Sequence, residues 1–366
     1  MNKILIVSLL ALMVLSCEKK DETIKVGAIL ALTGSGANYG KSLQQGIELA
    51  KDEINKSGGI KGKKMEVIYE DSQGDPKTGV SAFNKLVSMN NVPVVLGSIS
   101  SVVLAIAPIA DEKQVVFVNS SAISPKIKER ADKFLFSLIT SGADEAKLMA
   151  SELVKKHGSE PIGILFSNNA SGIDTKDSFI KELATDGGTI AFAEGYELGT
   201  NDFRSSLTKI KNSKAKYCYL IAFSSQEFAK IFIQSKEIGL RIQWYSYSGI
   251  ETKETLELSK GAADGVIYSY PSYLSNDSAM IKLQEKFSQS YGSWPDIYTV
   301  TSYDGVKLLS TVLNNYGTTS LEIQKGLRET KVYNGIFGKL DFSDKQCVSR
   351  DLIWKTIRFD KYEVVK

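Results

Sequence analysis

Strand-length apolar runs alternate with segments of helical periodicity along most of the chain, and this alternation constrains the fold most. The run KVGAIL (25–30) leads into a segment whose apolar residues share one helical face, Leu43, Ile47, Ala50 and Ile54. Strict alternation of strands and helices predicts a parallel sheet with helices on both faces. The run VPVVL (92–96) is continuously apolar, as expected for a strand that is covered on both faces.

The alternation occurs in two series, which predicts two lobes. The pattern restarts near residue 142, where a helical segment (144–158) precedes the strand-like PIGILFS (161–167). A chain of 366 residues is also too long for one typical core. No charge run or low-complexity linker separates the series. We therefore predict an α/β protein with two doubly wound parallel-sheet lobes, whose boundary is not a simple hinge in the sequence.

The N-terminus has the order of features of a secretory signal. Lys3 precedes a short apolar core (4–15), then small Ser16 and Cys17. The core is too short to span a bilayer comfortably. The ending VLSC resembles the lipobox of bacterial lipoproteins, although a plain secretory signal with a chance cysteine is the alternative. We predict that residues 1–16 are a signal peptide, that Cys17 carries lipid, and that 17–23 tether the protein to the cell-envelope membrane, facing the periplasm or the exterior.

Composition argues against several classes of function. Lys plus Arg is 45 and Asp plus Glu is 42, a near balance that does not favour a nucleic-acid partner. No C-x-x-C or H-E-x-x-H pattern indicates a metal, and we expect no cofactor. The one histidine, His157, precedes Gly158 at a predicted helix end, where a capping role is expected. With no G-x-S-x-G elbow, we do not expect an enzyme.

Two cysteines remain after Cys17. Cys218 lies in a strand-like apolar run, which predicts a small core residue, and Cys347 lies in a turn-like segment. A disulfide between them is left open.

The loop ALTGSGANYG (31–40) has the setting of a phosphate-binding turn, between a strand and a helix. The dinucleotide fingerprint requires Gly-x-Gly-x-x-Gly. Gly34 and Gly36 fit it, but Tyr39 stands at the third position and the glycine follows at Gly40. A secreted protein also meets little NAD. The loop is therefore interpreted as something other than a nucleotide site.

Residues 24–87 resemble the opening of type I periplasmic binding proteins, in the leucine/isoleucine/valine branch that feeds ABC transporters. The resemblance continues to the end of the chain. It implies two lobes joined by three crossovers, with a ligand cleft that closes by a hinge. The implied lobe I is 24–141 plus 272–352, and lobe II is 142–271 plus 353–366. The implied partners are a small-molecule ligand and ABC transporter permease subunits, and we expect a monomer.

The resemblance also assigns ligand-binding roles in lobe I. Tyr39 would reach over the ligand. The loop GSISS (97–101) would hold the ligand's carboxylate at a helix N-terminus. This loop is one residue shorter than is common, so Ser100 and Ser101 compete for the role. In the next loop, Ser121 and Ala122 would offer backbone groups, and Ile123 stands where the amino-acid binders have threonine.

The resemblance also assigns residues across the cleft and in the third crossover region. Ser171 replaces a tyrosine, whereas Phe223 and, in the third crossover region, Tyr298 match aromatic residues of the family. Ser248 replaces the glutamate that pairs with the ligand's ammonium. A buried ammonium left unpaired costs roughly 3 to 5 kcal/mol. We therefore expect a carboxylate, amide or other non-zwitterion as the ligand.

Two alternatives stay open. An amino acid could still bind if Glu251, three residues beyond Ser248, replaces the lost charge. Alternatively, the protein is a lipoprotein that senses a ligand or binds an envelope protein without transport.

Overall fold

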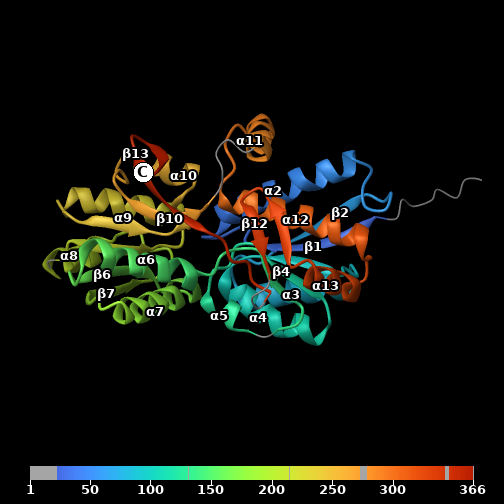
Figure 1. Ribbon diagram of the computed structural model, residues 1–366, viewed down its shortest axis with the longest axis horizontal. Coiled ribbons are helices and arrows are strands. Elements are labelled where there is room, and N and C mark those ends of the chain that lie inside the picture. Colours follow the sequence, from blue (N-terminus) through green and yellow to red (C-terminus); the bar gives the residue numbers. More distant parts are fainter. Residues whose placement is uncertain (1–22, 131, 214, 273–277, 343–345, 366) are drawn as a thin grey trace, which may run out of the picture.

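The computed structural model describes residues 23–130, 132–213, 215–272, 278–342 and 346–365. Two lobes lie side by side (Figure 1), one coloured blue, teal and orange and the other mostly green and yellow. The predicted signal peptide and Cys17 lie outside the described residues. None of the helices in the described ranges combines the length and apolar character needed to cross a membrane.

The first lobe is built on a five-stranded sheet in which every strand pair is parallel. Its strands, in spatial order, are β2 (Met65–Asp71), β1 (Ile24–Leu30), β3 (Val94–Gly97), β4 (Val116–Asn119) and β5 (Leu135–Ser137). Its helices are α2 (Ala37–Lys56), α3 (Pro76–Ser88), α4 (Ser100–Glu112), α5 (Pro125–Glu129), α12 (Ile297–Asn315) and α13 (Ser320–Glu329). Val94 and Leu96 pack into one apolar cluster and Val95 into another, so both faces of β3 are covered.

The second lobe is built on a seven-stranded mixed sheet. Its strands, in spatial order, are β14 (Lys361–Val364), β13 (Leu352–Arg358), β10 (Ile267–Pro271), β9 (Gln243–Ser246), β8 (Tyr217–Ile221), β6 (Ile162–Ser167) and β7 (Ile190–Tyr196). Its helices are α6 (Gly142–His157), α7 (Ala170–Thr185), α8 (Arg204–Ser213), α9 (Ser225–Glu237) and α10 (Lys253–Ser259), with a 3-10 turn η1 (Ser248–Ile250). The strands from β10 to β7 are parallel, whereas β13 and β14 pair antiparallel.

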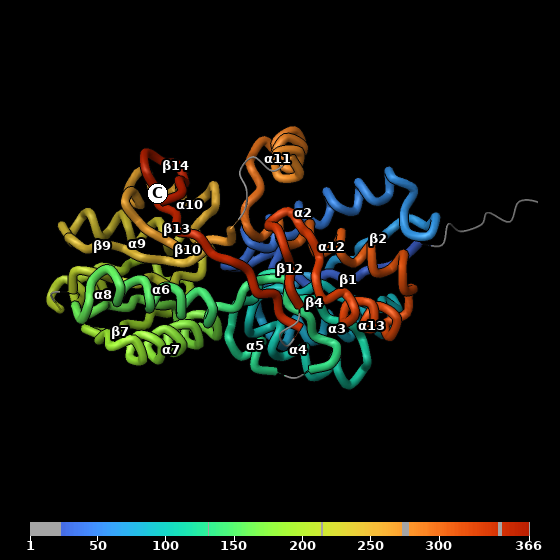
Figure 2. Tube along the Cα trace, in the orientation of Figure 1, coloured from blue at the N-terminus to red at the C-terminus, as the bar shows by residue number. Residues whose placement is uncertain are grey.

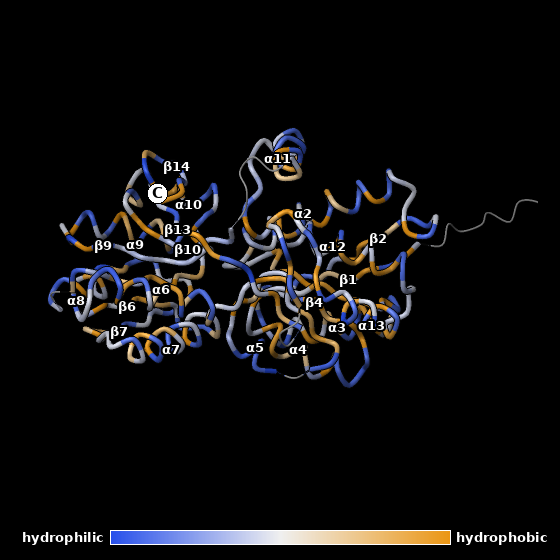
Figure 3. Tube along the Cα trace, viewed as in Figure 1, coloured by the Kyte–Doolittle hydropathy of each residue, from blue (hydrophilic) through white to orange (hydrophobic). Residues whose placement is uncertain are grey.

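The chain passes between the lobes more than once (Figure 2). After β5 in the first sheet it enters α6, which packs in the second lobe, and after β10 it returns through α11 (Ser278–Tyr291) to α12 on the first. A short hairpin of β11 (Val332–Gly335) and β12 (Gly338–Asp341) precedes its last passage into β13. Apolar residues concentrate on the central strands, while the surrounding helices alternate between apolar and polar positions (Figure 3). The prediction of two parallel-sheet lobes is confirmed.

The glycines of loop 31–40 serve the backbone rather than a phosphate. Gly34 has φ +80°, a conformation that side chains disfavour. A Cβ atom on Gly40 would lie 2.0 Å from the carbonyl oxygen of Ala31, so only glycine lets the first turn of α2 approach the end of β1 this closely. This close approach fixes the position of the neighbouring Tyr39.

Candidate functional site

A small cavity lies between the lobes and is lined from both. About 30 Å³ of it is open to the centre of a water-sized sphere, which is room for a few waters. Its wall contains eight of the ten ligand-binding residues that the sequence predicted, together with two that it did not, Ile99 and Tyr247. The predicted eight are Tyr39, Ser100, Ser121, Ala122, Ile123, Ser171, Phe223 and Tyr298. Ser101 and Ser248 lie outside this wall.

Aromatic rings from both lobes meet over the cavity. The ring of Tyr39 lies 4.6 Å from that of Tyr298 and meets Phe223 of the other lobe edge-on at 6.0 Å, measured between centroids. The Tyr39 hydroxyl is buried without a hydrogen bond of acceptable geometry among the described residues. Burial raises the pKa of Tyr39 well above its ordinary value, so the hydroxyl stays protonated. A buried hydroxyl without a partner costs about 1 to 3 kcal/mol, which a ligand acceptor would recover.

The N-terminus of α4 faces the cavity through a strained turn. Ile99, its N-cap, has φ 65° and ψ 123° and provides no side-chain hydrogen bond to the helix. A β-branched residue at positive φ is a true outlier, and such strain is concentrated at ligand sites. Ser100 follows, 5% exposed, and its Oγ accepts a hydrogen bond of 3.2 Å from the Ser124 N–H. The helix start therefore offers N–H groups and a positive dipole end to a ligand acceptor.

A carboxylate that the sequence analysis missed stands beside Ser248. The Ser248 N–H and Oγ donate to Glu145 of α6, at 3.0 and 2.7 Å, and the Ser269 hydroxyl donates to the same carboxylate. Glu145 is 1% exposed, and burial raises its pKa. Sequence did hold a signal, because Glu145 precedes Met149 by four residues and so shares the buried face of α6.

Glu251 is directed elsewhere. Its carboxylate accepts from Lys355 Nζ at 2.6 Å and from the Tyr268 hydroxyl, and all three side chains are buried. It lines a separate pocket with Trp294 and Tyr362 rather than the cavity between the lobes. The amino-acid alternative that relied on Glu251 therefore loses its geometric basis.

Polar contacts hold the lobes together on two sides of the cavity. On one side, Asp174 of α7 accepts from Ser124 Oγ at 2.5 Å and pairs with Lys126 Nζ at 2.8 Å. On the other, Asn38 of α2 donates to Glu254 of α10. The first lobe supplies the donors and the second the carboxylates. The cleft is thus in a closed arrangement.

The other chemically reactive residues are occupied in packing. His157 ends α6, stacks on Tyr217 at 3.6 Å, and its Nε2 lies 2.8 Å from the Tyr245 hydroxyl. Cys218 and Cys347 are both buried and form no disulfide in the described part of the chain. No group of His, Cys, Asp and Glu within the described residues has the arrangement of a metal site.

Sequence relatives and solved structures resemble this chain over most of its length. The Leu/Ile/Val-binding protein homolog 2 of Brucella abortus is 26% identical over 324 residues, which are 88% of this chain and 86% of that protein. An isoleucine complex of the branched-chain amino acid transporter substrate binding protein from Streptococcus pneumoniae superposes with a TM-score of 0.84 at 24% identity, covering 94% of this chain and all of that one. A solute binding protein of an ABC transporter from R. palustris, in complex with benzoate, gives a TM-score of 0.86 at 18% identity, covering 94% and 96%.

The family follows from a longer match. Residues 23–352 match the periplasmic binding protein family, a span that includes every residue of the cavity wall and all of both lobes except the last segment of the second. Family and fold are those of extracytoplasmic solute-binding proteins that serve ABC transporters. The chain belongs to the periplasmic binding protein family, in the type I branch of the Leu/Ile/Val-binding proteins.

Proposed function

We propose that the protein captures a small polar solute by hinge closure of its two lobes and delivers it to the permease of an ABC importer. The lobes of this proposal are 24–141 plus 272–352 and 142–271 plus 353–366. The observation that carries the proposal is the cavity whose wall is shared by the two lobes and covered by Tyr39 and Phe223. A solute held there contacts both lobes at once, so its binding favours the closed state.

The preferred solute has an acceptor group at one end and no α-ammonium. The start of α4 and Ser100 suit a carboxylate or amide oxygen, and the unsatisfied Tyr39 hydroxyl supplies another donor. Ser248 brings no carboxylate of its own. The similar structures from S. pneumoniae and R. palustris are complexes with isoleucine and with benzoate, so this fold accommodates acids with and without an ammonium group.

Glu145 favours a second candidate, an α-amino acid with a relocated anchor. Its carboxylate is buried, touches Ser248, and has only neutral donors among its hydrogen-bond partners in the described residues. A ligand ammonium at Ser248 would lie close to this charge. The carboxylate lies behind Ser248 and outside the cavity wall, which is why we rank this candidate second.

Paired ligands separate the two candidates. Calorimetric titration compares leucine with its deaminated analogue 4-methylpentanoate, with benzoate, and with the corresponding amides. Solution X-ray scattering measures whether each ligand compacts the protein. We expect at least one acid or amide to bind and compact the protein, and leucine not to bind. Micromolar leucine binding would overturn the first candidate. A ligand that binds without compaction would contradict hinge closure.

Glu145→Gln identifies the anchor, because glutamine keeps an acceptor for Ser248 and removes the charge. Under the first candidate, affinity for the acid changes little. Under the second, leucine affinity falls about 100-fold or more, as expected when a buried ion pair loses one partner. Melting temperatures of parent and variant serve as the control for folding.

Lipid on Cys17 anchors the protein in this proposal, because the cysteine directly follows the apolar signal and Ser16. Single acyl chains bind membranes only marginally, so several chains on one cysteine are needed for firm attachment. Cys17→Ser is expected to move the protein from the membrane to the soluble fraction on cell fractionation. A variant as membrane-bound as the parent would refute the anchor.

A further inference from the structure

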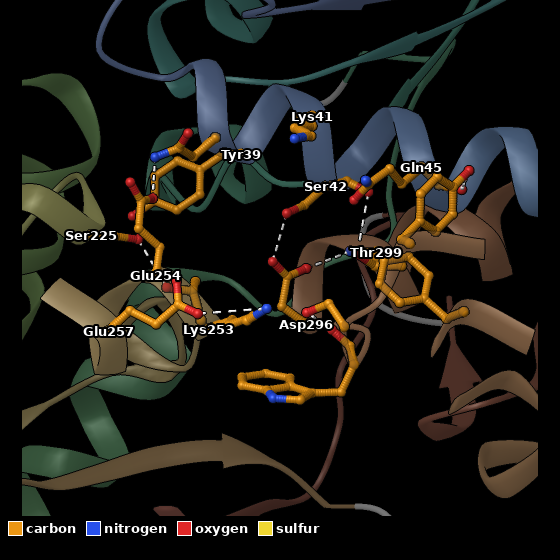
Figure 4. A pocket seen from close by; sticks show the side chains of 16 residues that line it. Tyr39, Lys41, Ser42, Gln45, Ser225, Lys253, Glu254, Glu257, Asp296 and Thr299 are labelled. Atoms are coloured by element: carbon orange, nitrogen blue, oxygen red, sulfur yellow. Dashed lines mark hydrogen bonds and ion pairs between the residues drawn. The ribbon is translucent and has the colours of Figure 1, made fainter. Parts of the chain in front are cut away.

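A second and larger compartment shares the Tyr39 side chain with the cavity as part of its wall. About 270 Å³ of it is open to the centre of a water-sized sphere, against about 30 Å³ for the cavity. Figure 4 shows its walls, with α2 of the first lobe facing α10 of the second. Tyr39 lines both spaces. The outer compartment therefore offers much more room for a solute than the cavity does.

Two carboxylates in the wall of the outer compartment are bound only by neutral donors. Asp296, 8% exposed, accepts from Ser42 Oγ at 2.7 Å and from the Thr299 N–H at 2.8 Å. Glu254, which is partly exposed, accepts from the amides of Asn38 and Gln226. Neither carboxylate forms an ion pair within the described ranges.

The lysines of the wall do not neutralise this pair. Lys253 reaches Glu257, at 3.5 Å, and Lys41 is exposed. Burial raises the pKa of both Asp296 and Glu254, so each carboxylate is held at a cost in its charged form. A positive charge between them would recover that cost.

The remaining wall suits a cation as well. The aromatic side chains of Trp294, Tyr291 and Phe287 line the same space. Aromatic faces attract ammonium and guanidinium groups, by roughly 0.5 to 2 kcal/mol according to how far the cation is desolvated. Glu254 belongs to the second lobe, while Asp296 is tied to α2 of the first through Ser42. A cation between the two carboxylates would therefore contact both lobes and favour closure.

The buried Tyr39 hydroxyl is an independent sign that a ligand group belongs here. It forms no hydrogen bond of acceptable geometry among the described residues, and the Tyr39 side chain lines both spaces. A single solute that occupies both spaces would have to extend past the Tyr39 side chain. Its acceptor end would then lie at Ser100 and its other end among the carboxylates.

We propose that the outer compartment binds the cationic end of the solute, an ammonium or guanidinium group that is distal to the acceptor end. The inference rests on the proposed function and specifies its solute class, an acid with a remote positive group in place of an α-amino acid.

The test compares two probes that differ in one group, 5-aminopentanoate and pentanoate. We expect 5-aminopentanoate to bind at least about tenfold more tightly in calorimetry. We also expect it to change the fluorescence of Trp294, a signal that Trp294→Phe removes. The double variant Glu254→Gln/Asp296→Asn should make the two affinities equal. Asparagine remains a good N-cap for α12 and glutamine keeps an acceptor for Asn38, so both helices keep their contacts.

The control Asp52→Asn/Glu285→Gln removes two charges outside the compartment wall, and we expect it to leave the preference intact. Equal binding of both probes by the parent, or no binding of 5-aminopentanoate at millimolar concentration, overturns the inference. If pentanoate binds and compacts the protein but 5-aminopentanoate does not bind, the proposed function is supported and the proposed cation site is contradicted. If neither these probes nor the earlier ligand panel compacts the protein, the proposed function and the proposed cation site are both contradicted.

Discussion

Replacing Gly46 by valine is expected to lower the free energy of unfolding by about 3 kcal/mol. Gly46 lies where α2 packs on α12. A Cβ atom there would be 2.2 Å from the carbonyl oxygen of Thr299 and 2.3 Å from Ser302 Oγ. The first atom is helix backbone and cannot move aside, and rotating the second away would break its hydrogen bond of 2.9 Å to the Leu43 carbonyl oxygen. The helices would have to separate.

The same change should weaken solute binding. Tyr39 is carried by α2 and Tyr298 by α12, and their rings lie 4.6 Å apart over the cavity. Moving the helices apart opens that contact. Denaturant midpoints and calorimetric melting measure stability, with Asp52→Val, an exposed position on the same helix, as the control for valine in a helix. Equal stability of the two variants would show that the close contact at Gly46 has no energetic consequence.

Local pattern was enough to predict the lobes because parallel sheets have a local signature. Buried strands such as Val94–Gly97 are apolar at almost every position, and the helices between them repeat every three to four residues. The antiparallel pairing at one end of the second sheet had no such signature. Leu352–Arg358 pairs antiparallel with Ile267–Pro271, and a pairing of residues this far apart in the chain cannot be read from either segment alone.

The residues of the candidate site also divide into those that could be predicted from the sequence and those that could not. Loop residues that follow strands, such as Ser121 and Phe223, were predicted from the resemblance to the family, and both line the cavity, as expected where parallel strands end at a common edge of the sheet. Glu145 could not be placed, because its contact with Ser248 joins residues 103 positions apart. The turn at Ile99 was also missed, since its strain arises only when a loop this short must connect β3 to α4.

Asp304 is a buried carboxylate beside the β11–β12 hairpin, and its charge should make stability depend on pH. It lies on α12, 2% exposed, and both of its oxygens lie 2.9 Å from the Ile336 N–H at the turn of the β11–β12 hairpin. The nearby Arg350 guanidinium, which donates to the Leu138 carbonyl oxygen, favours the charged form, but burial outweighs it. The pKa of Asp304 is raised from 3.8 to about 6.

Asp304→Asn is expected to remove a loss of stability that the parent shows as the pH rises. Between pH 4 and 6 the folded protein holds a proton on Asp304 that the unfolded chain has released, so the stability contributed by this group is greatest below pH 4, falls as the pH rises towards 6, and levels off above that. The interval from 3.8 to about 6 corresponds to about 3 kcal/mol. Other buried carboxylates, Glu145 and Asp296 among them, act in the same direction, so the difference between variant and parent is the quantity to measure. Denaturant unfolding from pH 4 to 8 should show this difference growing in favour of the variant up to about pH 7, whereas the exposed Asp264→Asn should run parallel to the parent. If the difference in free energy of unfolding between variant and parent is constant across that range, Asp304 has the same pKa in the folded and unfolded chains. Its contact with the hairpin would then contribute through packing and not through its charge.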